Sequence, residues 1–274
     1  MKKFAVIGNP IKHSLSPALH NWVFKSLGID ARYEKKRVFQ NQLAGIISDL
    51  HCGKQDGINV TIPHKENIMQ YLDEINPRAK SIGAVNLIMK NGNKLVGNNT
   101  DWFGLTMALK KNGIDPSGKE VIVLGAGGAA RSIIFAIKQS GVKNIVLLNR
   151  TLKKAEKLQD EIVFPSSLED SVIVIKNDSI IINTTSVGMQ SEQSPLDLGL
   201  LHENQILIDV IYTPLETAFL KFGKKIGAKT LNGLDMFIYQ GLASLDLWFG
   251  EDISMQVNFT HLKTYLENKL CLQK

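Results

Sequence analysis

The chain has 274 residues, of which 44% are hydrophobic and 21% charged, and its formal net charge at pH 7 is +6. This composition is typical of a globular protein with one or two domains. No apolar run reaches the roughly 18 residues of a membrane helix, and none forms a signal peptide. We therefore expect a cytoplasmic protein without a membrane partner. The positive charge lies in short clusters such as Lys35-Lys36-Arg37 rather than in a stripe, which argues against nucleic-acid binding and favours an anionic small molecule.

Strand-like and helical runs alternate along the whole chain, and this alternation predicts an α/β fold with mixed, mainly parallel sheets. Phe4–Ile7 is predicted to form the first strand. Ser16-Pro17 and Gly28 are typical start and stop signals of a helix, with Ser16 as its N-cap. The two cysteines, Cys52 and Cys271, are far apart and lack metal-ligand spacing, so neither a disulfide framework nor a metal site is expected.

The segment Asn59–Lys65 is an alternating strand that ends in a proline and a lysine. The alternation places Asn59 and Thr61 on one face and directs Val60 and Ile62 into a core. Proline cannot donate a ladder hydrogen bond, so the strand ends there or lies at a sheet edge. Lys65 beside two neutral hydrogen-bonding groups could hold and protonate a small oxygenated ligand, although a lysine after a strand is more often a solvated surface residue.

A hairpin is predicted from Val85–Met89 and Lys94–Gly97, which flank a turn centred on Gly92. Folding about this turn places Asn86 opposite Asn98 and gathers Asn86, Thr100 and Asp101 at one end of the hairpin. Asp101 has a second interpretation, since it precedes a predicted helix over residues 102–111 and could cap it.

A turn-rich link at residues 116–119 precedes a βαβ unit with strands at Val121–Leu124 and Asn144–Leu148. Later strands are predicted at 179–182, 206–210 and 229–231, and helices at 215–226, 234–249 and 257–270. We expect a substrate-binding catalytic domain over residues 1–101, completed by the helices of residues 237–274. A Rossmann-type dinucleotide-binding domain is expected over residues 102–236.

The βαβ unit carries Gly125-x-Gly127-x-x-Ala130 between its first strand and its helix, which fits the dinucleotide fingerprint. The second strand ends in Asn149-Arg150-Thr151, with Lys153 and Lys154 close behind and no acid that would bind a ribose 2′-hydroxyl. Arg150 could stack on adenine and pair with a 2′-phosphate, so NADP is preferred over NAD. The alternatives are a glycine-rich turn without a ligand and a solvated arginine.

Several motifs, in order and nearly end to end, resemble those of the shikimate dehydrogenase family. They are Gly8–Pro17, Asn59–Lys65, Gly83–Asn86, Asn99–Asp101, Tyr212-x-Pro214-x-x-Thr217 and Asn232–Met236 with Gln240-Gly241. The resemblance implies the reversible reduction of 3-dehydroshikimate to shikimate with NADP(H), by an oxidoreductase of aromatic amino acid biosynthesis.

The resemblance also implies roles for individual residues. Lys65 would be the catalytic acid, with Asp101 beside it. Substrate-binding residues would be Ser14, Ser16, Asn59, Thr61, Asn86, Tyr212 and Gln240. Cofactor-binding residues would be Gly125, Ala126, Gly127, Gly128, Ala129, Asn149, Arg150, Thr151, Lys154, Thr185, Ser186, Val210, Gly233 and Met236.

Two positions depart from the family pattern, because Trp102 stands where glycine is usual and Leu87 where threonine is common. We expect the tryptophan to have a packing role. His13, His20 and His64 are interpreted as structural or solvent-facing. A quinate/shikimate dehydrogenase that uses NAD and a non-catalytic nucleotide sensor remain alternatives, and the chain is expected to be a monomer or homodimer.

Overall fold

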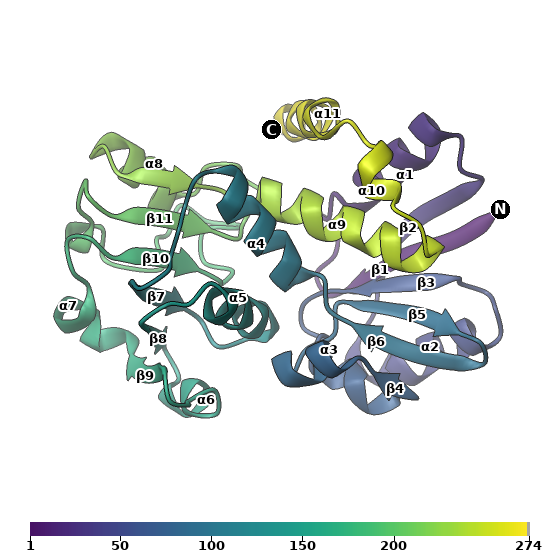
Figure 1. The fold of residues 1–274 in the computed structure, drawn as a ribbon, viewed down its shortest axis with the longest axis horizontal. Coiled ribbons are helices and arrows are strands. Elements are labelled where there is room, and N and C mark those ends of the chain that lie inside the picture. The colour runs from purple at the N-terminus through teal and green to yellow at the C-terminus, as the bar shows by residue number, and fades with distance from the viewer. Residues whose placement is uncertain (273–274) are drawn as a thin grey trace. The chain divides into compact units, whose positions relative to one another are not determined.

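The computed structural model describes residues 1–272, and these residues form two compact units (Figure 1). The first unit comprises Met1–Gly104 and the chain from Ile238 onward, and the second comprises Leu105–Phe237. The chain passes from one unit to the other within two helices, α4 (Asp101–Lys111) and α9 (Leu234–Phe249). Each unit contains one six-stranded sheet with helices, so the predicted α/β fold is confirmed.

The sheet of the first unit is mixed and has the order β2-β1-β3-β5-β6-β4. Its strands are β1 (Lys2–Gly8), β2 (Ala31–Arg37), β3 (Gly57–Val60), β4 (Glu74–Ile75), β5 (Leu87–Asn91) and β6 (Lys94–Asn98). The helices that lie wholly in this unit are α1 (Ser16–Leu27), α2 (Leu43–His51), α3 (Pro77–Ile82), α10 (Ile253–Gln256) and α11 (Phe259–Cys271). The predicted hairpin forms, and β5 and β6 pair antiparallel. Its register differs from the prediction by one residue, because Leu87 rather than Asn86 lies opposite Asn98.

The sheet of the second unit is parallel throughout and has the order β12-β11-β10-β7-β8-β9. Its strands are β7 (Glu120–Leu124), β8 (Asn144–Asn149), β9 (Val163–Ser167), β10 (Ile180–Asn183), β11 (Ile206–Asp209) and β12 (Lys229–Leu231). Its helices are α5 (Gly128–Gln139), α6 (Leu152–Glu156), α7 (Ser171–Val174) and α8 (Ala218–Lys225). The strand order reverses between β7 and β10, and α/β sheets bind ligands at the carboxyl ends of strands beside such a reversal.

The segment at residues 59–65 differs from the prediction in two ways. The strand β3 ends at Val60, and it lies between β1 and β5 rather than at an edge of the sheet. Ile62 is 53% exposed instead of buried, because the chain leaves the alternating strand geometry at Thr61. The turn that follows therefore sets the direction of Lys65, and strand alternation does not.

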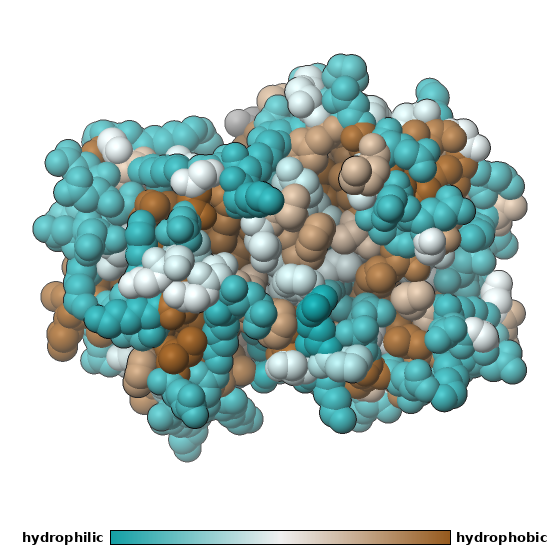
Figure 2. Space-filling view, in the orientation of Figure 1, coloured by the Kyte–Doolittle hydropathy of each residue, from teal (hydrophilic) through white to brown (hydrophobic). Residues whose placement is uncertain are grey.

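Apolar side chains fill the interior of each unit, and hydrophilic residues dominate the face shown in Figure 2. In the first unit, Ile7, Val60 and Leu95 belong to one buried cluster beneath the sheet. In the second unit, Ile122, Leu207 and Phe219 belong to another. Among residues 1–272, no helix combines the length and apolar character needed to cross a membrane.

Substitution of Gly57 by alanine should destabilise the first unit. An added Cβ would lie within 2.7 Å of the indole carbons of Trp248. The indole cannot easily move, since it stacks on Phe4 at 4.6 Å and its Nε1 donates to the Ile88 carbonyl at 3.0 Å. We expect Gly57→Ala to lower the free energy of unfolding by about 1–3 kcal/mol in urea denaturation. Gly45 in α2 is the control, because an added Cβ meets nothing within 4 Å there. Equal stability of the two variants would contradict the argument.

Candidate active site

A lysine and a carboxylate form a largely buried ion pair at the end of the hairpin in the first unit. Lys65 Nζ lies 2.5 Å from Asp101 Oδ2, and the two side chains are only 14% and 8% exposed. The backbone of Lys65 is held in place because its carbonyl accepts a hydrogen bond from Val85 N at 2.8 Å. Asp101 is the first residue of α4, but its carboxylate binds side chains rather than capping the helix.

Asn86 connects the ion pair to the hairpin. Its Nδ2 donates to Thr100 Oγ1 at 2.9 Å and to Asp101 Oδ1 at 2.8 Å, and its Oδ1 accepts from Thr100 N at 2.7 Å. The predicted gathering of these three residues is therefore confirmed. Gln240, on α9, lies 3.4 Å from Asn86 Nδ2 through its Oε1 and so belongs to the same cluster.

The two polar residues at the end of β3 have different surroundings. Asn59 is buried, and its Nδ2 donates to the Asn86 carbonyl at 3.1 Å and to Ser244 Oγ at 3.0 Å. Its Oδ1 accepts from the Tyr33 hydroxyl at 2.7 Å, so protein groups already use both amide hydrogens and the amide oxygen. Thr61 is partly buried, and its hydroxyl makes no hydrogen bond to any residue in the described part of the chain. Thr61 is therefore the freer of the two for a ligand.

The serine pair lies at the start of α1. Ser14 Oγ is 3.1 Å from Ser16 Oγ and accepts a hydrogen bond from Ser16 N at 3.3 Å. The prediction that Ser16 caps α1 is wrong, because Leu15 occupies the N-cap position and no side chain caps the helix. Two hydroxyls beside the positive end of a 12-residue helix suit a carboxylate. The preceding loop adjoins Thr61, since Asn9 N donates to the Ile62 carbonyl at 2.9 Å.

Two residues of this cluster were missed by sequence reasoning. Ser244 donates to the Gln240 carbonyl at 2.9 Å, and its hydroxyl lies 3.3 Å from Thr100 Oγ1, so it joins α9 to the polar network. The four-residue spacing from Gln240 on one helix could have indicated it. Tyr33 lies on β2, a strand that was not predicted, and no sequence signal connects it to Asn59.

The glycine-rich turn of the second unit has the geometry that a dinucleotide needs. Gly125 has φ +100°, and an added Cβ would lie 2.9 Å from both Thr184 Oγ1 and Thr185 Cγ2. Gly127 precedes α5 in an extended conformation, and an added Cβ would meet nothing within 4 Å, so a ligand could approach its backbone closely. Ala126, Gly128 and Ala129 complete the turn and the start of the helix. The N-terminal amides of α5 can therefore bind a pyrophosphate.

Two cations, Arg150 and Lys154, follow the end of β8. Asn149 Nδ2 donates to the Thr151 carbonyl at 2.7 Å, which shapes the turn around Arg150. Arg150 and Lys154 are exposed, and the side chain of neither forms a hydrogen bond or ion pair within residues 1–272. A free guanidinium at this position fits a 2′-phosphate better than a 2′-hydroxyl.

The other predicted ligands of the second unit lie on the loops after β10 and β11. Thr185 contacts the Gly125 turn, and Ser186 beside it is exposed. Gly233 packs so closely on Val210 that an added Cβ would lie 2.5 Å from its carbonyl carbon. Met236 is partly buried at the start of α9. The ring of Tyr212, the only predicted substrate residue in this unit, lies 4.3 Å from that of Phe237.

A buried carboxylate connects these loops and was not predicted. Asp209 is fully buried, and its oxygens accept from Ile211 N at 3.0 Å, Asn183 Nδ2 at 3.1 Å and Thr217 Oγ1 at 2.8 Å. Burial raises the pKa of Asp209 from 3.8 to about 6, and the three hydrogen bonds oppose this shift only in part. Asn183 Oδ1 accepts in turn from Thr185 N at 3.0 Å, so Asp209 supports the loop beside the Gly125 turn.

The histidines have structural surroundings, as expected. His20 stacks on Tyr33 at 4.1 Å, and burial lowers the pKa of His20 to about 3, which keeps it neutral. His64 Nε2 lies 2.7 Å from the Val38 carbonyl, and His13 is exposed. Trp102 stacks under the guanidinium of Arg78 at 4.4 Å, which supports the packing role. Within residues 1–272, no three His, Cys, Asp or Glu side chains cluster closely enough to hold a metal ion.

Comparisons with known proteins identify the family of the chain. Residues 6–88 match a family model described as the shikimate dehydrogenase substrate binding domain, and residues 106–196 match one described as shikimate / quinate 5-dehydrogenase. Shikimate dehydrogenase (NADP(+)) of Bacillus cytotoxicus is 41% identical over 97% of this chain and 98% of its own length.

Solved structures give the same family. Shikimate 5-dehydrogenase of Thermus thermophilus, in complex with NADP(H) and shikimate, superposes with a TM-score of 0.85 at 35% identity, covering 98% of this chain and 100% of its own. Shikimate 5-dehydrogenase of Listeria monocytogenes, in complex with shikimate and NAD, has a TM-score of 0.84 at 32% identity, covering 97% of this chain and 96% of its own.

The buried Asp209 should make stability depend on pH in a way that asparagine removes. Because its pKa in the folded chain is about 6 against an ordinary 3.8, the carboxyl group stabilises the fold most at low pH, and this contribution disappears as the pH rises through 6. Between about pH 4.5 and pH 7.5, the free energy of unfolding of Asp209→Asn should therefore rise by about 2 kcal/mol relative to the unsubstituted chain.

Urea denaturation at the two pH values measures this difference. Asp178→Asn is the control, since it removes a negative charge from an exposed side chain of the same unit. A difference between Asp209→Asn and the unsubstituted chain that stays constant across the two pH values would contradict the argument.

Proposed function

Because the chain belongs to the shikimate dehydrogenase family, we propose that it catalyses the reversible reduction of 3-dehydroshikimate to shikimate with NADPH. The observation that carries this proposal is the Lys65–Asp101 ion pair. Asp101 Oδ2 lies 2.5 Å from Lys65 Nζ, and Asp101 Oδ1 lies 2.8 Å from Asn86 Nδ2. Membership of the family supports the substrate and the cofactor, since relatives over 40% identical bear the name shikimate dehydrogenase (NADP(+)).

Lys65 is the proposed acid in this reaction. Bound NADPH would supply a hydride to the carbonyl carbon of the substrate. Negative charge then develops on the carbonyl oxygen, and the Lys65 ammonium can stabilise that charge and transfer a proton to the oxygen. Asp101 holds the ammonium in position and balances its charge within a site that is mostly closed to water. In shikimate oxidation, Lys65 would accept the hydroxyl proton.

The polar cluster around the ion pair would orient the substrate. Ser14 and Ser16 would bind its carboxylate at the start of α1, and Thr61, with its free hydroxyl, would bind a ring hydroxyl. Asn86 and Gln240 would contribute further hydrogen bonds, with Tyr212 as a residue of the second unit. Asn59 would act mainly by holding Asn86, because its amide hydrogens are already donated to the Asn86 carbonyl and Ser244.

The two units would bind different ligands, as the family models suggest. The unit formed by Met1–Gly104 and the chain from Ile238 onward would bind the substrate, and Leu105–Phe237 would bind NADP(H). The Gly125 turn and the start of α5 would hold the pyrophosphate, and Arg150 with Lys154 would hold the 2′-phosphate. Thr185, Ser186, Val210, Gly233 and Met236 would border the nicotinamide half.

Initial rates with shikimate and quinate, each with NADP and NAD, test the proposal against its nearest rival. The rival deserves the test because one family model also names quinate and one related structure holds NAD. We expect the highest kcat/KM with shikimate and NADP. Arg150→Ala should lower kcat/KM for NADP about tenfold and leave that for NAD unchanged, with Lys157→Ala as the exposed control. Faster turnover with quinate and NAD would refute the assignment.

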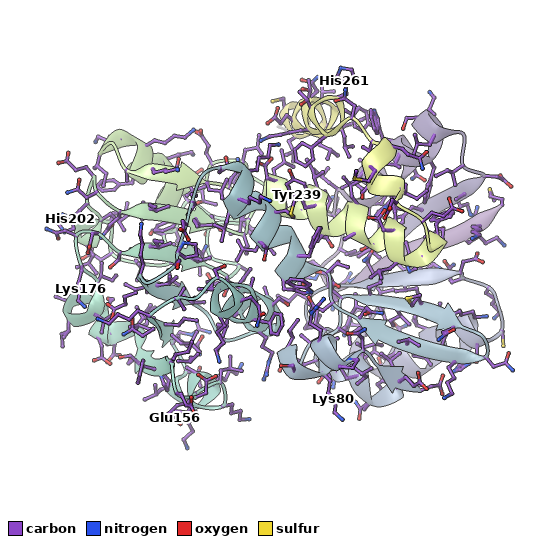
Figure 3. The ribbon with its side chains drawn as sticks, in the orientation of Figure 1. Lys80, Glu156, Lys176, His202, Tyr239 and His261 are labelled. Atoms are coloured by element: carbon purple, nitrogen blue, oxygen red, sulfur yellow. The ribbon has the colours of Figure 1, made fainter. Side chains whose placement is uncertain are left out.

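Replacement of Lys65 tests the mechanism. Lys65→Ala should lower kcat by about 100-fold or more, because the proton donor is removed, while the Kd for NADPH stays the same. Lys80→Ala is the control, since Lys80 lies on α3 of the same unit and its exposed side chain points outward (Figure 3). Thermal unfolding of each variant shows whether the fold is retained. A near-normal kcat in Lys65→Ala would rule out this residue as the catalytic acid.

A further inference from the structure

Strand β2 directs three side chains toward the elements that carry the substrate-binding residues of the first unit. Tyr33, Lys35 and Arg37 alternate along the strand and so share one face of the sheet. The Tyr33 hydroxyl donates to Asn59 at 2.7 Å, as described above. Lys35 Nζ donates to the Lys12 carbonyl at 2.5 Å, and Arg37 Nε donates to Asn9 Oδ1 at 2.9 Å. Two cations are thus attached to the loop that leads into Ser14.

The charged side chains on the opposite face of β2 have different partners. Glu34 and Lys36 form an ion pair at 3.2 Å, so their charges compensate each other. Lys35 and Arg37 form no ion pair with any carboxylate among residues 1–272, and Arg37 instead lies over the Phe39 ring at 4.9 Å. The basic run Lys35-Lys36-Arg37 therefore consists of one paired cation and two unpaired ones on the face of the serine loop.

The unpaired cations Lys35 and Arg37 both reach from β2 to one short loop and repel each other, and holding their long side chains in place costs conformational entropy. An anion at this loop would offset both effects. The hydroxyls of Ser14 and Ser16 are neutral, so a carboxylate bound to them would keep its full negative charge. Burying a charge with only neutral partners is unfavourable compared with burying it near an opposite charge.

We propose that Lys35 and Arg37 supply the countercharge for the substrate carboxylate held at Ser14 and Ser16, and thereby select carboxylate-bearing substrates over neutral ones. This inference rests on the proposed function and deepens it, since it names the residues that set the charge preference of the same site. Both cations are exposed, so salt and water screen their effect, which acts on capture and binding of the anion rather than on the chemical step.

Steady-state kinetics of shikimate oxidation test the proposal. Lys35→Gln and Arg37→Gln should each raise the KM for shikimate about threefold to tenfold, with a smaller change in kcat and none in the KM for NADP. Lys35→Arg should restore the low KM, because it keeps the charge. Lys36→Gln is the matched control, since it removes the same charge from the neighbouring residue on the opposite face, where Glu34 already compensates it.

Two further measurements distinguish an electrostatic role of Lys35 and Arg37 from a purely structural one: the salt dependence of the KM for shikimate and the KM for a neutral analogue. Raising NaCl from about 50 mM to about 500 mM should raise the KM for shikimate in the unsubstituted enzyme and much less in the Lys35→Gln/Arg37→Gln double variant. The KM for the carboxamide of shikimate should be the same in both enzymes.

Three outcomes would overturn the inference: an unchanged KM in Lys35→Gln, an equal effect of Lys36→Gln, or an equal effect on the carboxamide. Each of these leaves an active unsubstituted enzyme. Failure of the proposed function is distinguishable, because the unsubstituted protein would then not oxidise shikimate with NADP at all.

Discussion

The first unit is organised around one buried ion pair, Lys65 with Asp101. An isolated ammonium or carboxylate at 14% or 8% exposure would be costly, so each requires the other and further hydrogen bonds. Asn86 meets this requirement for Asp101, and Thr100 and Gln240 hold Asn86 in turn. The end of β3, the start of β5, the start of α4 and the middle of α9 must therefore meet at one place. A shift of α4 would separate the two charges, and a shift of β5 or α9 would remove hydrogen bonds that support the pair.

The second unit contains a buried charge under a different constraint. Asp209 accepts from three hydrogen-bond donors and pairs with no cation in the described part of the chain, and burial raises its pKa to about 6. Neutral donors cannot fully replace water, so a carboxylate there opposes stability at neutral pH. Asp209 supports the loops that hold Thr185 and Tyr212. Because these loops carry predicted ligands, this support explains why an unfavourable buried carboxylate occurs there. The two units thus hold buried carboxylates in two ways, Asp101 in an ion pair with Lys65 and Asp209 through hydrogen bonds from neutral donors.

The geometry of β2 determines which of its three neighbouring cations form an ion pair. A run of three cations in the sequence becomes one paired residue and two unpaired ones, because neighbouring side chains of a strand point to opposite faces. The same alternation brings the Tyr33 hydroxyl to Asn59, so β2 is connected to the polar cluster of the first unit. Arg150 in the second unit resembles Lys35, since each is a cation without an acidic partner among residues 1–272 and lies beside a proposed anion site.

The sequence alone determined the features that depend on short-range rules. The hairpin around Gly92, the glycine turn before α5, the α/β class and the gathering of Asn86 with Asp101 follow from turn residues, alternation and spacing, and the structure contains each of them. The strand pattern singled out Lys65, and the family motifs added the role of catalytic acid for Lys65 and the role of the serines as carboxylate ligands. Strand β2 was not predicted, because it has few apolar residues and is held mainly by its pairing with β1.

The tertiary structure decided where polar groups find their partners. It exposed Ile62, removed the capping role of Ser16, and connected Ser244 and Asp209 to residues far away in the sequence. Local sequence rules cannot predict these hydrogen-bond partners. A buried polar group pairs with whichever donor or acceptor the packed elements bring within about 3 Å, and these partners become neighbours only once the sheets and helices have come together.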